Sequence, residues 1–142
     1  MRLSISQKTI TVILDAGPLY ALFDAKDAWH QRAHRWFECH PKATLITTWV
    51  VLAEVCHLLS RRIHNQAALD FLAWVRSGAV QLDTPVQNQS LDHMLESCKR
   101  YADLPLDLAD SSVAETAARL GVRHILSVDS DLTIYRDRTG KP

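Results

Sequence analysis

The sequence predicts a three-layer α/β/α fold, in which a mainly parallel central sheet is flanked by helices. Short runs of β-branched and aliphatic residues alternate along the chain with longer segments whose apolar residues recur at helical spacing. Strands that are separated by helices indicate a parallel sheet. The first strand, residues 10–14, reads ITVIL, a fully apolar run of the kind that a parallel sheet buries on both faces.

The next elements continue this alternation. Pro18 stands where a helix could begin after the first strand, since proline is favoured in the first turn of a helix. Residues 28–40 place Ala33, Trp36 and Phe37 at helical spacing, and residues 43–48 return to strand character. This stretch therefore predicts a helical connection between two neighbouring strands.

Two helices and a short strand follow. Residues 49–62 carry an apolar stripe that includes Val51 and Val55, and residues 66–76 form a second amphipathic segment that should end near Gly78. Residues 79–84, AVQLDT, predict a short strand.

The last third of the chain predicts two helices and a strand. The helices cover residues 87–101 and 108–120, and the second should stop at Gly121 before a strand at 124–128. The tail at 135–142, YRDRTGKP, is expected to be loose.

Composition indicates one globular domain over residues 1–142. The chain is 47% hydrophobic and 23% charged, and it has no internal repeat, low-complexity tract or Gly/Ser-rich linker. Lys and Arg together number 16, as do Asp and Glu, so no net positive charge would draw the protein to nucleic acid or to an anionic membrane. A polyanionic substrate would need a local attraction.

Cysteine usage and the N-terminus predict a cytoplasmic protein without a membrane partner. Cys39, Cys56 and Cys98 are odd in number and widely spaced, which is typical of a reducing compartment. Residues 1–14 are too polar for a signal peptide, and no stretch has the roughly 18 apolar residues of a membrane span.

Four acids map to one edge of the predicted sheet. In an open parallel sheet, ligands bind outside the carboxyl ends of the strands, and Asp15 and Asp129 each follow a strand directly. Glu54 shares the stripe of its helix that should face the core, and Asp110 lies on the predicted inward face in the first turn of its helix. Neither position suits an isolated charge.

Each acid also has an ordinary structural interpretation. Asp107 could be a helix N-cap, Asp110 a first-turn acid favoured by the helix dipole, and Asp15 a turn residue. Glu54 could pair with Arg61 or Arg62 on a later turn of its helix, and Asp131 is most simply a solvated loop acid.

These separate explanations leave open why the four acids converge with no basic residue in the same motifs. Carboxylates a few ångströms apart repel and raise one another's pKa, and a hard divalent cation removes that cost. Ligation by oxygen alone suits Mg²⁺ or Mn²⁺, and the lack of His or Cys argues against zinc. The expected metal ligands and catalytic residues are Asp15, Glu54, Asp110 and Asp129, with Asp107 and Asp131 as further candidate ligands.

The motifs around these acids resemble the PIN domain family, and most closely its VapC-type toxins from bacterial toxin–antitoxin pairs. The resemblance rests on VILDAGPLYALFD at 12–24, AEV at 53–55, and LPLDLADSSVAETAARLGVRHILSVDSDL at 104–132. It implies a metal-dependent endoribonuclease that hydrolyses RNA phosphodiester bonds, acts as the toxin of a type II pair, and forms a homodimer inhibited by a small antitoxin protein.

Three positions depart from the family's pattern. Ala16 stands where many members carry Thr, Ser111 where many carry Ala, and Ser127 where many carry Thr. Ser127 keeps a hydroxyl that can support a metal ligand, whereas Ala16 has none.

Other functions are weighed against this one. A phosphotransfer enzyme of the haloacid dehalogenase type would need a second Asp at position 17, which is Gly, and a receiver domain would need paired acids at the first strand. A non-catalytic PIN-like module that binds RNA or protein would be expected to lack one or more of the acids, and all four are present.

Overall fold

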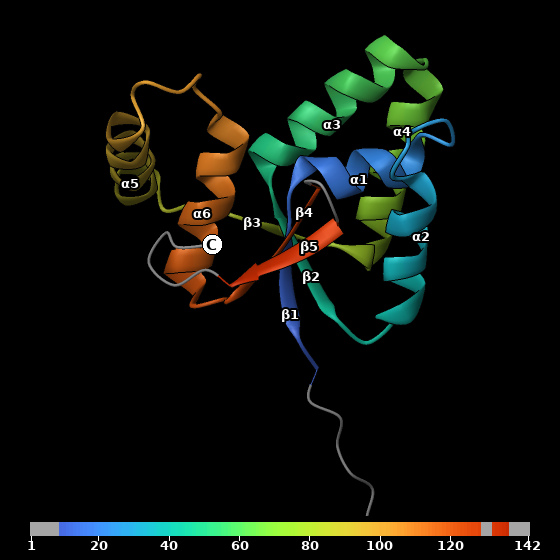
Figure 1. Cartoon of the computed structure of the whole chain (residues 1–142), viewed down its shortest axis with the longest axis horizontal. Coiled ribbons are helices and arrows are strands. Elements are labelled where there is room, and N and C mark those ends of the chain that lie inside the picture. The colour runs from blue at the N-terminus through green and yellow to red at the C-terminus, as the bar shows by residue number, and fades with distance from the viewer. Residues whose placement is uncertain (1–8, 129–131, 137–142) are drawn as a thin grey trace, which may run out of the picture.

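A five-stranded sheet forms the centre of the molecule (Figure 1). The computed structural model describes residues 9–128 and 132–136. The strands lie side by side in the order β3-β2-β1-β4-β5. Their bounds are Thr11–Leu14 for β1, Thr44–Thr48 for β2, Gln81–Asp83 for β3, His124–Val128 for β4 and Leu132–Arg136 for β5.

Helices cover both faces of this sheet, as predicted. Figure 1 shows α5 and α6 on one side of the sheet and α1, α2 and α4 on the other, while α3 packs against both α4 and α6. None of the described helices is long and apolar enough to cross a membrane. The helix bounds are Ala16–Phe23 for α1, His30–Cys39 for α2, Trp49–Arg62 for α3, Asn65–Trp74 for α4, Gln87–Arg100 for α5 and Leu108–Leu120 for α6.

The strand connections create a switch point beside β1. Strands β1 to β4 are parallel, and β1 pairs with β2 on one side and with β4 on the other. The chain runs from β1 through β2 to β3, then crosses back by way of α5 and α6 to β4. Ligands of open α/β sheets bind outside the carboxyl ends of the strands at such a reversal. The carboxyl end of β1 therefore marks the expected site.

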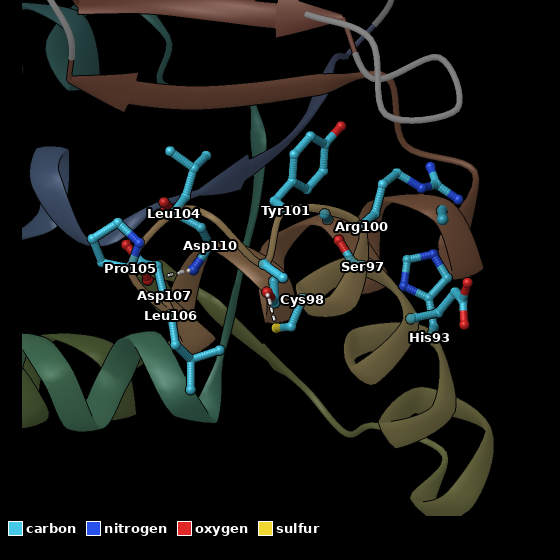
Figure 2. A pocket seen from close by; sticks show the side chains of 15 residues that line it. His93, Ser97, Cys98, Arg100, Tyr101, Leu104, Pro105, Leu106, Asp107 and Asp110 are labelled. Carbon is cyan, nitrogen blue, oxygen red and sulfur yellow. Dashed lines mark hydrogen bonds between the residues drawn. The ribbon is translucent and has the colours of Figure 1, made fainter.

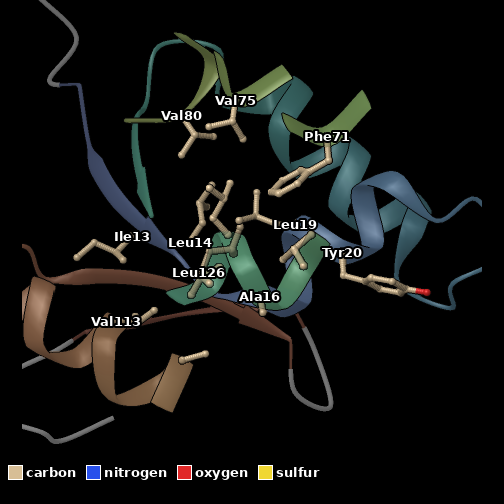
Figure 3. Close-up of a cluster of buried hydrophobic side chains, with 14 of the residues drawn as sticks. Ile13, Leu14, Ala16, Leu19, Tyr20, Phe71, Val75, Val80, Val113 and Leu126 are labelled. Carbon is tan, nitrogen blue, oxygen red and sulfur yellow. The ribbon is translucent and has the colours of Figure 1, made fainter. Parts of the chain in front are cut away.

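The core explains why β1 reads as an uninterrupted apolar run. Val12, Ile13 and Leu14 are all fully buried, because helices cover both faces of the sheet at its centre. Figure 3 shows Leu14, Leu19 and Leu126 within one cluster of buried side chains. This rigid centre fixes the residue that follows β1.

The predicted bounds of the first and fourth helices differ from the structure. The first helix begins at Ala16, two residues before Pro18, because the Asp15 side chain caps it. Helix α4 ends at Trp74 and passes into a single π-helical turn, Val75–Ala79, in which Gly78 takes a φ of 98° that favours glycine.

The prediction of a loose tail from residue 135 was wrong for its first two residues. Residues 135 and 136 belong to β5, which pairs antiparallel with β4. The apolar residues in LTIYR alternate with a period of two, which is the strand signal that the tail's charged end obscured. Residues 137–142 lie outside the described part of the chain.

Candidate acidic active site

Asp15 holds its place through two hydrogen bonds. It follows β1 directly and is the N-cap of α1, where its Oδ1 accepts a hydrogen bond of 2.8 Å from the Ala16 amide. The Ser127 hydroxyl, on neighbouring β4, donates to Asp15 Oδ2 over 3.3 Å. Both interactions leave the carboxylate at the carboxyl edge of the sheet, and the Ser127 hydroxyl contacts one of the predicted metal ligands.

The first turn of α6 brings two further acids to this edge. Asp107 is the N-cap, as the structural interpretation predicted, and its Oδ1 accepts a hydrogen bond of 3.0 Å from the Asp110 amide. Asp110 is exposed as a residue and does not lie within the core, but its partly buried carboxyl group faces Asp15 and Asp107, with which it hydrogen-bonds. Helix α6 instead buries its face at Ala109, Val113 and Ala117. Asp110 therefore stands at the rim of the core, open to a ligand.

Glu54 reaches the same place from α3. It is half-buried, next to the fully buried Val55, and its carboxylate interacts electrostatically with the carboxylates of Asp107 and Asp15. Within residues 9–128, no ion pair joins Glu54 to Arg61 or Arg62, so the proposed pairing with those residues is not found. Asp15, Glu54, Asp107 and Asp110 together are called the acidic cluster below.

The acidic cluster is electrostatically unfavourable without a counter-charge. Partial burial raises the pKa of Asp110 to about 8, and the neighbouring Asp15 and Asp107 carboxylates add to this through charge and hydrogen bonding. Burial, then Asp107 and Asp15, raise the pKa of Glu54 above its usual value. Since α1 and α6 both begin here, their positive N-terminal ends offset only part of the repulsion.

The donor set fits a hard divalent cation. It is made of carboxylate oxygens, and the charges of Asp15 and Asp107 act on both Glu54 and Asp110. In the part of the chain that the structure describes, no three Asp, Glu, His or Cys side chains are already arranged to hold a metal ion. The predicted ligand Asp129 follows β4 directly in the sequence, but Asp129 and Asp131 lie outside the described residues.

Comparison with known proteins identifies the fold that carries this cluster. The PIN domain family profile matches residues 12–137, most of the chain. The chain belongs to the PIN domain family. No curated protein matches the sequence.

Solved structures with the same PIN fold include VapC toxins. VapC20 of Mycobacterium tuberculosis, a toxin that cleaves the sarcin–ricin loop, superposes with a TM-score of 0.76 at 25% identity, over 85% of this chain and 92% of that one. PAE2754 from Pyrobaculum aerophilum gives a TM-score of 0.56 at 20% identity, over 88% of this chain and 85% of that one. VapBC2 from Rickettsia felis, bound to a DNA fragment from its promoter, gives a TM-score of 0.59 at 10% identity, over 85% of this chain and 89% of that one.

One residue of this PIN domain's site was missed by the sequence reasoning. Gly17 lies in the first turn of α1, and a Cβ added there would stand 3.0 Å from both Cβ and Cγ2 of Val128 on β4. Glycine is therefore required for α1 to approach β4 closely. The sequence signal was Gly17 itself, two residues after Asp15.

A groove opens beside the acidic cluster of the PIN domain (Figure 2). Its volume is about 790 Å³, and it lies between α5, α6 and the segment that joins them. Asp107 and Asp110 line one end, and Arg100 and His93 line the α5 side. Leu104 and Leu106, which also line it, are 61% and 73% exposed. The groove thus joins an apolar surface to the carboxylates.

Proposed function

We propose that this PIN domain is a metal-dependent endoribonuclease that acts as the toxin of a type II toxin–antitoxin pair. The observation that carries the proposal is the acidic cluster, in which carboxylates from the end of β1, from α3 and from α6 lie close together, and burial followed by the charges of Asp15 and Asp107 raises the pKa values of Glu54 and Asp110. The similarity to a toxin that cleaves a structured RNA supports RNA as the substrate.

The proposed ligands of Mg²⁺ or Mn²⁺ are Asp15, Glu54, Asp110 and Asp129, with Asp107 and Asp131 as further candidates. A divalent cation in such a site supplies a polarised water and a clamp for phosphate oxygens, so hydrolysis requires no protein nucleophile. Ser127 orients Asp15, and Asp107 fixes the first turn of α6 that presents Asp110. Without a cation, the pKa of Asp110 is about 8, so Asp110 would hold a metal ion only by giving up its proton at neutral pH.

An RNA cleavage assay tests this proposal. Purified protein should cleave RNA with Mg²⁺ or Mn²⁺ present and stop when EDTA is added. Asp110→Asn should lower the cleavage rate by at least about 100-fold, while Asp92→Asn, an exposed acid on α5, should leave it unchanged. Site-specific cleavage by the pure protein in excess EDTA would contradict metal dependence. A wild-type protein that binds RNA without cutting it would favour the non-catalytic binding module.

The groove supports an antitoxin as the partner. The exposed Leu104 and Leu106 line the groove beside Asp107 and Asp110 and offer apolar contacts next to negative charge. Leu91 and Leu95 on α5 and Leu108 at the start of α6 are also exposed. A partner segment with apolar side chains and one basic residue would cover both features and block the site. The occurrence of VapBC2 as a complex that binds promoter DNA supports a partner of this kind.

Solution measurements test the assembly. We propose a homodimer, so size-exclusion chromatography with light scattering should give about twice the 16.0 kDa chain mass. The product of a neighbouring small gene should bind and inhibit cleavage, and Leu106→Asp should weaken that binding while leaving the metal response intact. A strict monomer that has no affinity for that product would contradict this part of the proposal.

A further inference from the structure

A chain of buried hydrogen bonds joins α3 to α6 beneath the acidic cluster. The Val51 amide donates to Thr48 Oγ1 over 3.0 Å, which caps α3. Thr48 Oγ1 lies 2.7 Å from Ser112 Oγ, and the Ser112 hydroxyl donates to the Ala109 carbonyl over 2.7 Å. Thr48 and Ser112 are 4% and 5% exposed, so water does not replace these bonds.

Only one arrangement of protons satisfies this chain. The Ala109 carbonyl can only accept, so the single hydroxyl proton of Ser112 points to it. Ser112 Oγ must then accept from Thr48 Oγ1, which in turn accepts from the Val51 amide. The link between the two helices is therefore directional, and deletion of either hydroxyl leaves a buried group without its partner.

The two helices that this link joins both carry negative charges, which repel each other. Thr48 caps the helix that holds Glu54, while Ser112 and its acceptor Ala109 flank Asp110 in the sequence. Repulsion among the carboxylates of the acidic cluster acts to separate α3 from α6. A buried hydrogen bond between the helices resists that separation at a point next to the acids.

We infer that Thr48 and Ser112 are positioning residues, which set the spacing between Glu54 on α3 and Asp110 on α6 and thereby the affinity of the site for a divalent cation. The inference rests on the proposed function, since it concerns the metal ligands of that site. Neither hydroxyl contacts the cation or the RNA in this account. Partners that orient metal ligands affect metal affinity by roughly 10- to 100-fold.

Calorimetric titration with Mn²⁺, without RNA, tests the inference. Ser112→Ala removes the acceptor, Thr48→Val removes the donor, and Thr48→Ser keeps the hydroxyl. Thr116→Val is the matched control, because the Thr116 hydroxyl is also buried on α6 but donates to Asp83 of β3, over 2.9 Å. Each titration is run well below the melting temperature of the variant, so that all of the protein is folded.

We expect Ser112→Ala and Thr48→Val each to weaken Mn²⁺ binding about tenfold, and the double variant to weaken it little further, since both changes break one link. Thr48→Ser and Thr116→Val should bind Mn²⁺ with the affinity of wild type, although Thr116→Val should have a lower melting temperature. Thr48→Val also removes the N-cap of α3 and could prevent folding. In that case the Ser112→Ala titration alone tests the inference, because this variant retains the Thr48 cap.

Three negative results are distinguishable. If Asp110→Asn loses Mn²⁺ binding while Ser112→Ala binds like wild type, the positioning role is wrong and the metal site stands. If Thr116→Val weakens binding as much as Ser112→Ala, the effect is general loss of stability and the positioning role is again wrong. If wild type and Asp110→Asn give the same titration, the proposed metal site itself is wrong, and this inference falls with it.

Discussion

Asp110 makes the stability of the metal-free protein depend on pH. Its pKa is about 8 in the folded protein and near 3.8 in an unfolded chain. Between these values the folded state binds more protons than the unfolded state, so stability should fall as the pH rises from about 4 to about 8 and then level off. Because Asp110 is open to solvent, water and salt reduce the size of this effect.

Urea unfolding in EDTA at several pH values measures this effect. The free energy of unfolding of wild type should decline between pH 5 and pH 8 relative to that of Asp110→Asn, which lacks the titrating group. Addition of Mn²⁺ should reverse the decline in wild type. Parallel pH profiles for the two proteins would show that the folded-state pKa of Asp110 is not raised.

Ser127 supports Asp15 through a single hydroxyl. Ser127→Ala should remove the 3.3 Å hydrogen bond to Asp15 Oδ2 and slow RNA cleavage by roughly 10- to 100-fold, while Ser127→Thr should retain activity. The melting temperature should change little, since the contact is only partly buried. Full activity of Ser127→Ala would show that Asp15 needs no support from β4.

At the scale of elements, Gly17 sets how closely α1 approaches β4. A methyl group at this position would meet Val128 at 3.0 Å, so Gly17→Ala should destabilise the protein by about 1–3 kcal/mol. Val128→Ala removes one of the two clashing atoms, and the double variant should therefore be more stable than the sum of the single effects predicts. Urea unfolding of the four proteins measures this coupling, and strict additivity would contradict the close approach.

The far end of α6 is held to β3 by a buried ionic network. Arg119 pairs with Asp83 and Glu115, and their side chains are 17%, 9% and 5% exposed. Arg119→Ala leaves two carboxylates without their cationic partner and should cost about 3 kcal/mol or more, whereas the exposed Arg123→Ala should cost under about 0.5 kcal/mol. The role is structural, so the residual folded protein should bind Mn²⁺ like wild type in calorimetry. A weakened affinity would contradict that separation.

Helix ends were predictable from the sequence where the capping residue is local. The bounds of α3 and α6 agree with prediction, because Thr48 and Asp107 cap their starts and Gly121 ends α6 with a φ of 68°. Strand β5 was missed because the charged residues that follow it obscured the weak alternation of apolar and polar residues in LTIYR. The convergence of Asp15, Glu54 and Asp110 was predicted from the strand end at Asp15 and from the helix faces that carry Glu54 and Asp110. The exposure of Asp110 and the link from Thr48 to Ser112 depend on distances that only packing defines.

At the scale of the whole molecule, a bound cation should stabilise the fold by relieving the repulsion of the acidic cluster. Mn²⁺ at about 100 times its dissociation constant should contribute about 2.7 kcal/mol. For a domain of this size, that corresponds to a rise in melting temperature on the order of 5 to 10 °C. Exchange of a carboxylate ligand for an amide should remove most of this Mn²⁺-induced rise in melting temperature, because the change removes one metal ligand and also part of the repulsion that the cation would relieve.

Differential scanning fluorimetry of wild type and Asp110→Asn, each with Mn²⁺ and with EDTA, tests the central claim that the acidic cluster is a metal site. The account predicts a large Mn²⁺ shift for wild type, a much smaller one for Asp110→Asn, and a metal-free Asp110→Asn that melts no lower than metal-free wild type. Equal Mn²⁺ shifts in both proteins, or a metal-free Asp110→Asn that melts well below wild type, would show that Asp110 is a structural residue of the helix start and would contradict the account.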